Sequence, residues 1–182
     1  LKMDTAGNIL DYDLHTDSLG GHFLFNKRYP LIYDANPQQY ILSGDIYGRE
    51  SDFLMILTNN GDLQKYIELP YPPGILTSHI RAIYPQSDGY ILFFNRQISN
   101  GKIQLTMVRL NEEGTVLWEQ FYAHQSVNSA TLSDVWQKDD NTFVIGSGFG
   151  YTDHLDAENS WTKSWIFAVD SLGNVLWERE GE

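Results

Sequence analysis

The sequence contains no cysteine, few basic side chains and no long apolar run. The missing cysteine excludes a disulfide framework, thiolate catalysis and Cys-ligated zinc or iron–sulfur sites. No apolar run approaches the roughly 18 to 20 residues that a membrane helix needs, so we expect no direct membrane insertion. The 24 acidic side chains outnumber the 12 basic ones, and the resulting formal net charge of −12 argues against nucleic acid as a partner.

Aromatic and turn-forming residues are abundant instead. Of the 182 residues, 42% are apolar and 14% are aromatic, and they are accompanied by 15 Gly and 6 Pro. Apolar residues come in short runs bounded by Gly, Pro, Asn or Asp, without a sustained helical period. This pattern predicts an all-β globular protein built from short strands and many tight turns.

A short turn motif occurs four times along the chain. Each copy has an apolar residue, a small polar residue, two turn residues and a glycine, and a strand-forming residue follows two positions later. The copies are Met3–Gly7, Leu57–Gly61, Leu110–Gly114 and Val169–Gly173. Each copy therefore predicts a β-hairpin with its glycine at positive φ. Within these turns we expect Asp4, Asn111 and Asp170 to accept backbone N–H bonds.

A second repeated element precedes three of these hairpins. It consists of an apolar segment, a turn and a strand beginning Tyr40–Gly44, Tyr90–Phe94 or Phe143–Ser147. Together the two elements describe a unit of four antiparallel strands, A to D, with a period of roughly 50 to 55 residues. From this recurrence we expect 39–46, 89–95 and 142–148 to be equivalent strands.

Four-stranded units repeated at this period predict a β-propeller. The chain would contain about three and a half blades, namely a C–D hairpin at 1–14 and complete blades at 29–69, 79–123 and 131–181. A two-sheet sandwich is the alternative. We expect Trp118, Trp136 and Trp177 to fill the gaps between sheets, with Trp177 either between neighbouring sheets or against a missing neighbour. Because this count does not close a ring, we also expect the ends to be covered by further blades of the same polypeptide or by another subunit.

Two segments resemble the blades of a known group of proteins. Asp88–Leu92 and Asp170–Trp177 are similar to the GYILxG strand and the LDxxGNVxW hairpin of secreted or surface β-propellers of Gram-negative bacteria. Such propellers occur in type IX-exported proteins and in outer-membrane-associated lipoproteins. The resemblance implies an extracellular or cell-surface location, with the periplasm as the alternative.

The last hairpin also resembles the tryptophan-docked blades of quinoprotein dehydrogenases. Ala168, Asp170, Gly173 and Trp177 approach that motif, but the turn is one residue shorter and its Thr is missing. We therefore expect no quinone cofactor.

The segment from Gly148 to Lys163 interrupts the repeat and is predicted to be a long B–C loop. Its potential ligands are Asp153, Asp156 and Glu158, together with His154. Hard oxygen ligands of this kind suit Ca²⁺, although the order of an EF-hand is absent. The alternative is a solvated insertion without a metal. No other histidine has metal-site spacing, and there is no Gly-x-Ser-x-Gly elbow or phosphate loop.

In an antiparallel blade, the B–C and D–A connections emerge at the same end. Aromatic and imidazole side chains in these connections predict a contact surface for a protein or a glycan. They are Tyr71, His124, Phe149, Tyr151 and Trp161. The alternative is that Tyr71 merely caps a blade edge. We expect a non-catalytic binding or scaffold protein, and the competing hypothesis is a carbohydrate-active enzyme using carboxylates such as Asp153 and Glu158.

Overall fold

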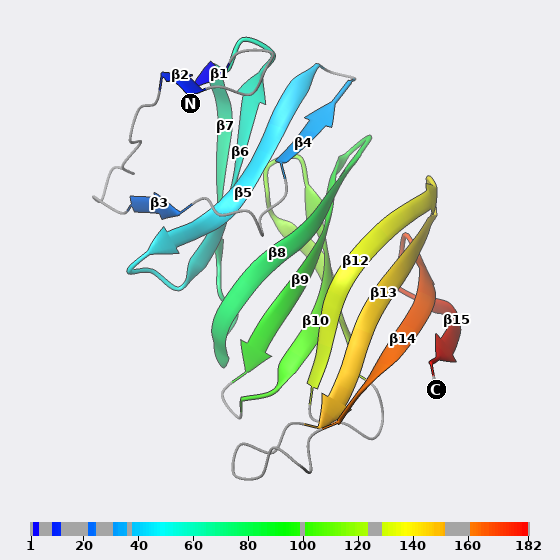
Figure 1. The fold of residues 1–182 in the computed structure, drawn as a ribbon. Helices are drawn as coiled ribbons and strands as arrows, with labels where there is room; N and C mark the ends of the chain where they lie inside the picture. The colour runs from blue at the N-terminus through cyan, green and yellow to red at the C-terminus, as the bar shows by residue number, and fades with distance from the viewer. Residues whose placement is uncertain are drawn as a thin grey trace. The chain divides into compact units, whose positions relative to one another are not determined.

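A computed structural model describes residues 2–3, 9–11, 22–24, 31–35, 38–98, 101–123, 129–151 and 161–181 (Figure 1). This part of the chain is entirely strands and turns, which confirms the all-β prediction. The chain divides into two compact units, Leu1–Pro70 and Tyr71–Glu182.

Unit 1 contains a two-stranded hairpin and the first sheet. The hairpin pairs β1 (Lys2–Met3) with β2 (Ile9–Asp11), as expected for residues 1–14. The first sheet comprises β3 (His22–Leu24), β4 (Leu31–Asp34), β5 (Gln39–Tyr47), β6 (Ser51–Thr58) and β7 (Leu63–Pro70). Both β3 and β4 pair with β5, so the first edge strand is split in two. The sequence pattern did not predict β3.

Unit 2 contains two four-stranded antiparallel sheets. The second sheet comprises β8 (Ile75–Gln86), β9 (Gly89–Ile98), β10 (Ile103–Asn111) and β11 (Val116–Tyr122). The third comprises β12 (Ser129–Asp139), β13 (Thr142–Tyr151), β14 (Trp161–Asp170) and β15 (Val175–Glu180). Neighbours in sequence are neighbours in each sheet. The three strands predicted to be equivalent lie within β5, β9 and β13, which confirms them as strands.

The hairpin that closes each sheet has the same geometry three times. Gly61, Gly114 and Gly173 have φ values of 87°, 89° and 85°. Each amide donates to the carbonyl three residues earlier, over 2.9 to 3.1 Å. The register then shifts on each returning strand, where Gln64, Leu117 and Leu176 are the extra residues of a bulge. The turns have glycine at positive φ, as the repeated motif predicted.

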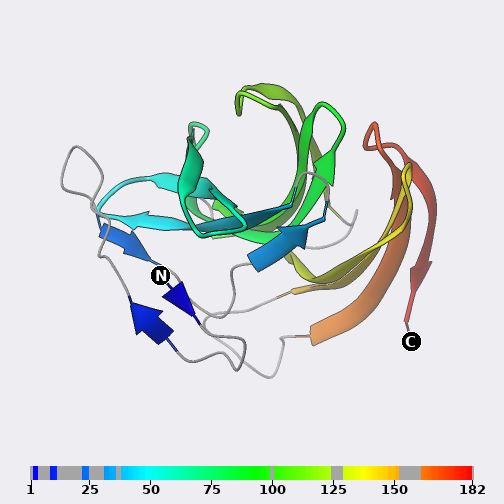
Figure 2. The ribbon, with the colours of Figure 1, turned by 90° about the horizontal axis from the view of Figure 1, so that it is seen from above.

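The two sheets of unit 2 pack face to face (Figure 2). Their shared core includes three aromatic rings: the Tyr84 and Phe143 centroids lie 5.1 Å apart, and those of Phe93 and Phe143 lie 5.5 Å apart. Phe93 and Phe143 are fully buried, and they come from β9 and β13 respectively. Tilted aromatic pairs at these distances add to the free energy of burying the rings.

Three side chains of the second sheet also hydrogen-bond to the main chain of the third. The Tyr84 hydroxyl donates to the Val135 carbonyl at 2.6 Å, and the Tyr122 hydroxyl donates to the Gly173 carbonyl at 2.9 Å. Asn95 accepts from the Leu132 amide at 2.8 Å and donates to the Leu132 carbonyl at 3.2 Å. These bonds fix the register of one sheet against the other.

The three tryptophans expected between sheets differ in their surroundings. Trp118 is partly buried and packs against the core between the second and third sheets, as predicted. Trp136 is 63% exposed and Trp177 is 43% exposed, so the prediction for Trp136 is wrong in this chain. The reason is its position: Trp136 and Trp177 belong to the face of the third sheet that points away from the shared core.

Candidate functional site: the two ends of the sheets

Each sheet has two chemically different ends. The A–B turns and C–D hairpins lie at the turn end, while the B–C and D–A connections lie at the loop end. Figure 1 shows the loop ends of both unit 2 sheets at the bottom. The B–C connections there are 48–50, 99–102 and 152–160 in the three sheets, so the third is much the longest.

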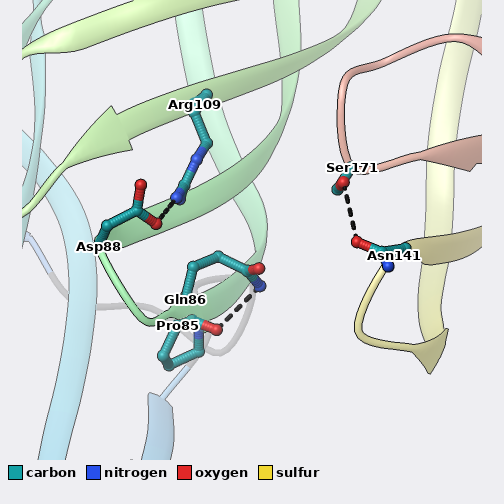
Figure 3. Close-up of polar contacts among 6 residues, drawn as sticks. All are labelled: Pro85, Gln86, Asp88, Arg109, Asn141 and Ser171. Atoms are coloured by element: carbon teal, nitrogen blue, oxygen red, sulfur yellow. Dashed lines mark hydrogen bonds and ion pairs between the residues drawn. The ribbon is translucent and has the colours of Figure 1, made fainter.

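At the turn end, a polar side-chain contact is present in each of the three sheets. The residue just before strand B contacts the C–D turn in the first and third sheets and strand C in the second sheet. The pairs are Gln38 with Asn59 (3.4 Å), Asp88 with Arg109, and Asn141 with Ser171 (3.3 Å). Figure 3 shows the two pairs in unit 2. At this end, non-covalent polar contacts therefore join strands or turns within each sheet.

The hairpin side chains Asn111 and Asp170 have the structural role predicted for them. Asn111 Oδ1 accepts from the Thr115 amide at 2.8 Å. Asp170 Oδ1 accepts from the amides of Leu172 at 2.9 Å and Asn174 at 2.8 Å. Partial burial opposes ionisation of Asp170, but hydrogen bonds, led by those from Asn174, outweigh it and lower its pKa below the ordinary value. Asp4 lies outside the described residues.

A carboxylate of the third A–B turn behaves similarly. Asp139 Oδ1 accepts from the Asn141 amide at 3.0 Å. This backbone bond is the largest influence lowering the pKa of Asp139, with a side-chain bond from Thr142 next. The carboxylates Asp139 and Asp170 at the turn end thus stabilise turns.

At the loop end, Tyr71 and Phe149 occupy different environments. Tyr71 lies between β7 and β8, is half-buried, and its hydroxyl donates to the Ser78 carbonyl at 3.4 Å. This contact agrees with an edge-capping role. Phe149 is 2% exposed and its ring centroid lies 6.4 Å from that of Trp165. Phe149 is therefore a core residue, and it is not available to a partner in this structure.

The long loop begins later and ends earlier than the sequence predicted. Gly148, Phe149, Gly150 and Tyr151 continue β13, and they pair in register with Ser164, Lys163, Thr162 and Trp161 of β14. The alternation of glycine with aromatics places Phe149 in the core and lets the ladder continue. The main chains of Tyr151 and Trp161 therefore pair at the base of the 152–160 connection.

The remaining predicted site residues lie outside the described residues. These are His124 of the contact surface and the potential metal ligands Asp153, His154, Asp156 and Glu158. Within the described ranges, no three His, Asp or Glu side chains gather closely enough to hold a metal ion. The Ca²⁺ site stays a prediction from the sequence.

A buried, charged side chain of the second sheet was not among the residues predicted from the sequence. Arg96, on β9, is 6% exposed and forms an ion pair with Glu119 on β11. Its guanidinium carbon lies 4.4 Å from the centroid of the Phe94 ring. The ion pair and the ring together offset the free energy of desolvating the guanidinium. An arginine near the end of an otherwise apolar strand was the only sequence signal, and its partner could not be inferred.

None of the described residues forms a helix of the length and apolar character needed to cross a bilayer. No protein-family model matches this chain, and no curated protein is significantly similar to it. A functional assignment therefore depends on the chain's own residues and geometry.

Proposed function

We propose that this chain is part of a β-propeller and serves as a non-catalytic binding or scaffold module of an exported or cell-surface bacterial protein. The propeller architecture is supported by the packing in unit 2. Two sheets of identical strand order lie face to face around one core, and three side chains of the second sheet bond to the third. Successive blades of a propeller pack in this manner.

The observation that carries the binding role is the contrast between the two ends of the sheets. Turn ends repeat the same hairpin, and in each sheet the residue before strand B makes a polar contact there, whereas the connections at loop ends differ in length from sheet to sheet. A rigid scaffold with variable connections at one end is the usual arrangement of a recognition surface. The pairing of Tyr151 with Trp161 places two aromatic residues at the base of the longest connection.

The partner class follows from charge and residue type. A net charge of −12 favours a basic protein surface over nucleic acid. Aromatic residues at the loop end also suit a glycan, so the contact is with a protein or a glycan. The location outside the cytoplasm is supported by the likeness of Asp88–Leu92 and Asp170–Trp177 to blades of exported propellers, and the periplasm is the alternative.

The test is a comparison of loop-end and turn-end variants. The full chain is screened for binding on a glycan array and on an array of basic peptides. We expect a ligand whose affinity falls at least about tenfold in the double variant Tyr151→Ser, Trp161→Ser, because hot-spot aromatics carry most of the binding free energy. The control is Leu172→Ser, which alters an exposed apolar residue at the turn end and should leave binding unchanged.

Two results would contradict the proposal. One is an affinity that the turn-end control lowers as much as the loop-end variant does. The other is hydrolysis of chromogenic glycosides that is lost in Asp153→Asn or Glu158→Gln, which would establish a carbohydrate-active enzyme.

A further inference from the structure

The second and third sheets carry equivalent rows of residues across their four strands. In the second sheet, cross-strand register aligns Tyr84, Ile91, Arg109 and Trp118. In the third sheet, the same register aligns Trp136, Val144, Ala168 and Trp177. Each row lies on the face that points onward along the chain, from one sheet toward the next.

The row of the second sheet is covered by the third sheet. Tyr84 donates its hydroxyl hydrogen to the Val135 carbonyl, and Trp118 packs against the shared core. Met107, one row further along β10, has no exposed surface. Burial also raises the pKa of Tyr84 to about 12, with the nearby charge of Asp134 adding to the effect.

In the equivalent row of the third sheet the two edge residues, Trp136 and Trp177, are exposed, and Ala168 between them is buried in place of Arg109. Trp136 takes the place of Tyr84, so a large ring with a polar hydrogen is kept. Trp177 takes the place of Trp118, and Ile166 takes the place of Met107. The exposed fractions are 63% for Trp136, 43% for Trp177 and 47% for Ile166. Large apolar side chains that cluster on a sheet face in this way mark an interaction surface.

We propose that this outer face of the third sheet docks a further four-stranded antiparallel sheet of the same repeat, carried by the same polypeptide. The incoming sheet lies on the third sheet as the third lies on the second. Trp136 Nε1–H then donates to a main-chain carbonyl of the incoming first strand, as the Tyr84 hydroxyl does to Val135. Equivalent positions of a repeat have equivalent neighbours, which is the reason for choosing a repeat sheet over an unrelated partner.

The outer face also specifies the shape of what it receives. Gly146 and Gly148 stand where the second sheet has Phe93 and Asn95. A Cβ placed on either glycine would meet nothing closer than a main-chain oxygen 3.8 Å away. The incoming sheet must therefore present large side chains here, because interiors are packed without voids. The inner face of the third sheet, with Phe143, Phe149 and Phe167, has that character.

The experiment uses the full chain extended at its C-terminus by a second copy of residues 123–182. This inference rests on the propeller part of the proposed function and not on ligand binding, so its failure leaves the loop-end binding test untouched. We expect the extension to raise the unfolding midpoint by at least about 4 °C, since each added repeat interface contributes to the stability of the whole array. Tryptophan emission should shift to the blue and acrylamide quenching should fall.

Matched variants identify the face. Ile166→Asp in the original copy should abolish the gain in midpoint and in tryptophan protection, whereas Leu172→Asp, an equally apolar but turn-end position, should preserve both. In Trp136→Phe, the ring at position 136 should still be buried by the added sheet, but part of the rise in unfolding midpoint should be lost. An added copy that melts separately, without protecting any tryptophan, overturns the proposal. So does an unextended chain whose self-association, measured by analytical ultracentrifugation, is abolished by Ile166→Asp, because the occupant is then a second copy.

Discussion

The second and third sheets share strand order, hairpin geometry and polar ties, but their onward faces differ completely in exposure. Trp118 and Trp177 stand at the same register position, and only Trp118 has a sheet packed over it. Tyr84 and Trp136 are also equivalent, and among the described residues only Tyr84 has a hydrogen-bond acceptor on a neighbouring sheet. The difference shows that a residue at a given repeat position is buried only where another sheet packs over it. The residue type makes such burial possible but does not produce it.

The first prediction tests the covered interface by removing an aromatic ring from the core between the second and third sheets. Phe143→Ala deletes a side chain with no exposed surface that contacts Tyr84 and Phe93. We expect the free energy of unfolding to fall by about 3 to 5 kcal/mol. The control is Val144→Ala, on the opposite face of the same strand, with a cost below about 1.5 kcal/mol. Urea unfolding measures both, and equal losses would contradict the assignment of faces.

The second prediction concerns the side-chain amide of Asn95, which joins the second sheet to the third. Asn95→Ala leaves the amide and the carbonyl of Leu132 without their side-chain partner. We expect a loss of about 2 kcal/mol, because unsatisfied buried groups retain their desolvation penalty. Asn141→Ala serves as the control, since that exposed side chain makes a single contact to Ser171, and its cost should be within about 0.5 kcal/mol. Similar losses in the two variants would contradict a cross-sheet role.

The third prediction uses pH and the Tyr84 hydroxyl. The folded-state pKa of about 12 lies above the unfolded value of 10.0, so the contribution of Tyr84 is full below about pH 10 and is lost as pH rises toward 12. Tyr84→Phe should cost about 1 kcal/mol at neutral pH and should flatten the alkaline loss of stability. Tyr33→Phe, at an exposed position, is the control. An unchanged alkaline profile in Tyr84→Phe would refute this prediction.

The fourth prediction compares the hairpins of the two sheets. Asp170 and Asn111 accept equivalent backbone bonds, but only Asp170 ionises. Each alanine substitution should cost about 1 kcal/mol at neutral pH. Because hydrogen bonds lower the folded-state pKa of Asp170, its contribution is present above about pH 4 and is lost as pH falls below that. Acid titration of stability should therefore differ between wild type and Asp170→Ala, and not between wild type and Asn111→Ala.

The smallest expected effect is at the open face. Trp136→Ala should change the stability of this chain by no more than about 0.5 kcal/mol, because the side chain is 63% exposed. The covered counterpart, Tyr84→Ala, should cost several times as much. Thermal and urea unfolding of the two variants measure the contrast, and a large loss for Trp136→Ala would show that the exposed face already has a partner.

The features predicted correctly from the sequence are those with local causes. A glycine at positive φ and a side-chain oxygen that accepts backbone N–H bonds define each C–D hairpin within five residues. The oxygen belongs to Thr58, Asn111 or Asp170, so the turns at Gly61, Gly114 and Gly173 were recognisable without tertiary structure. The strands beginning near Tyr40, Tyr90 and Phe143 followed from their apolar runs between turn signals. The split edge strand β3 had no such signal, because its pairing with β5 is a contact between distant parts of the chain.

The candidate contact residues depended on information that is not local. Tyr71 and Phe149 are both aromatic, but Tyr71 caps the edge of a sheet whereas Phe149 lies in the core. The sequence by itself determined the all-β class, the hairpins and the order of strands within the second and third sheets, because turn chemistry acts over a few residues. Only the tertiary structure decided which face of each sheet is covered, because that depends on the sheet packed against it.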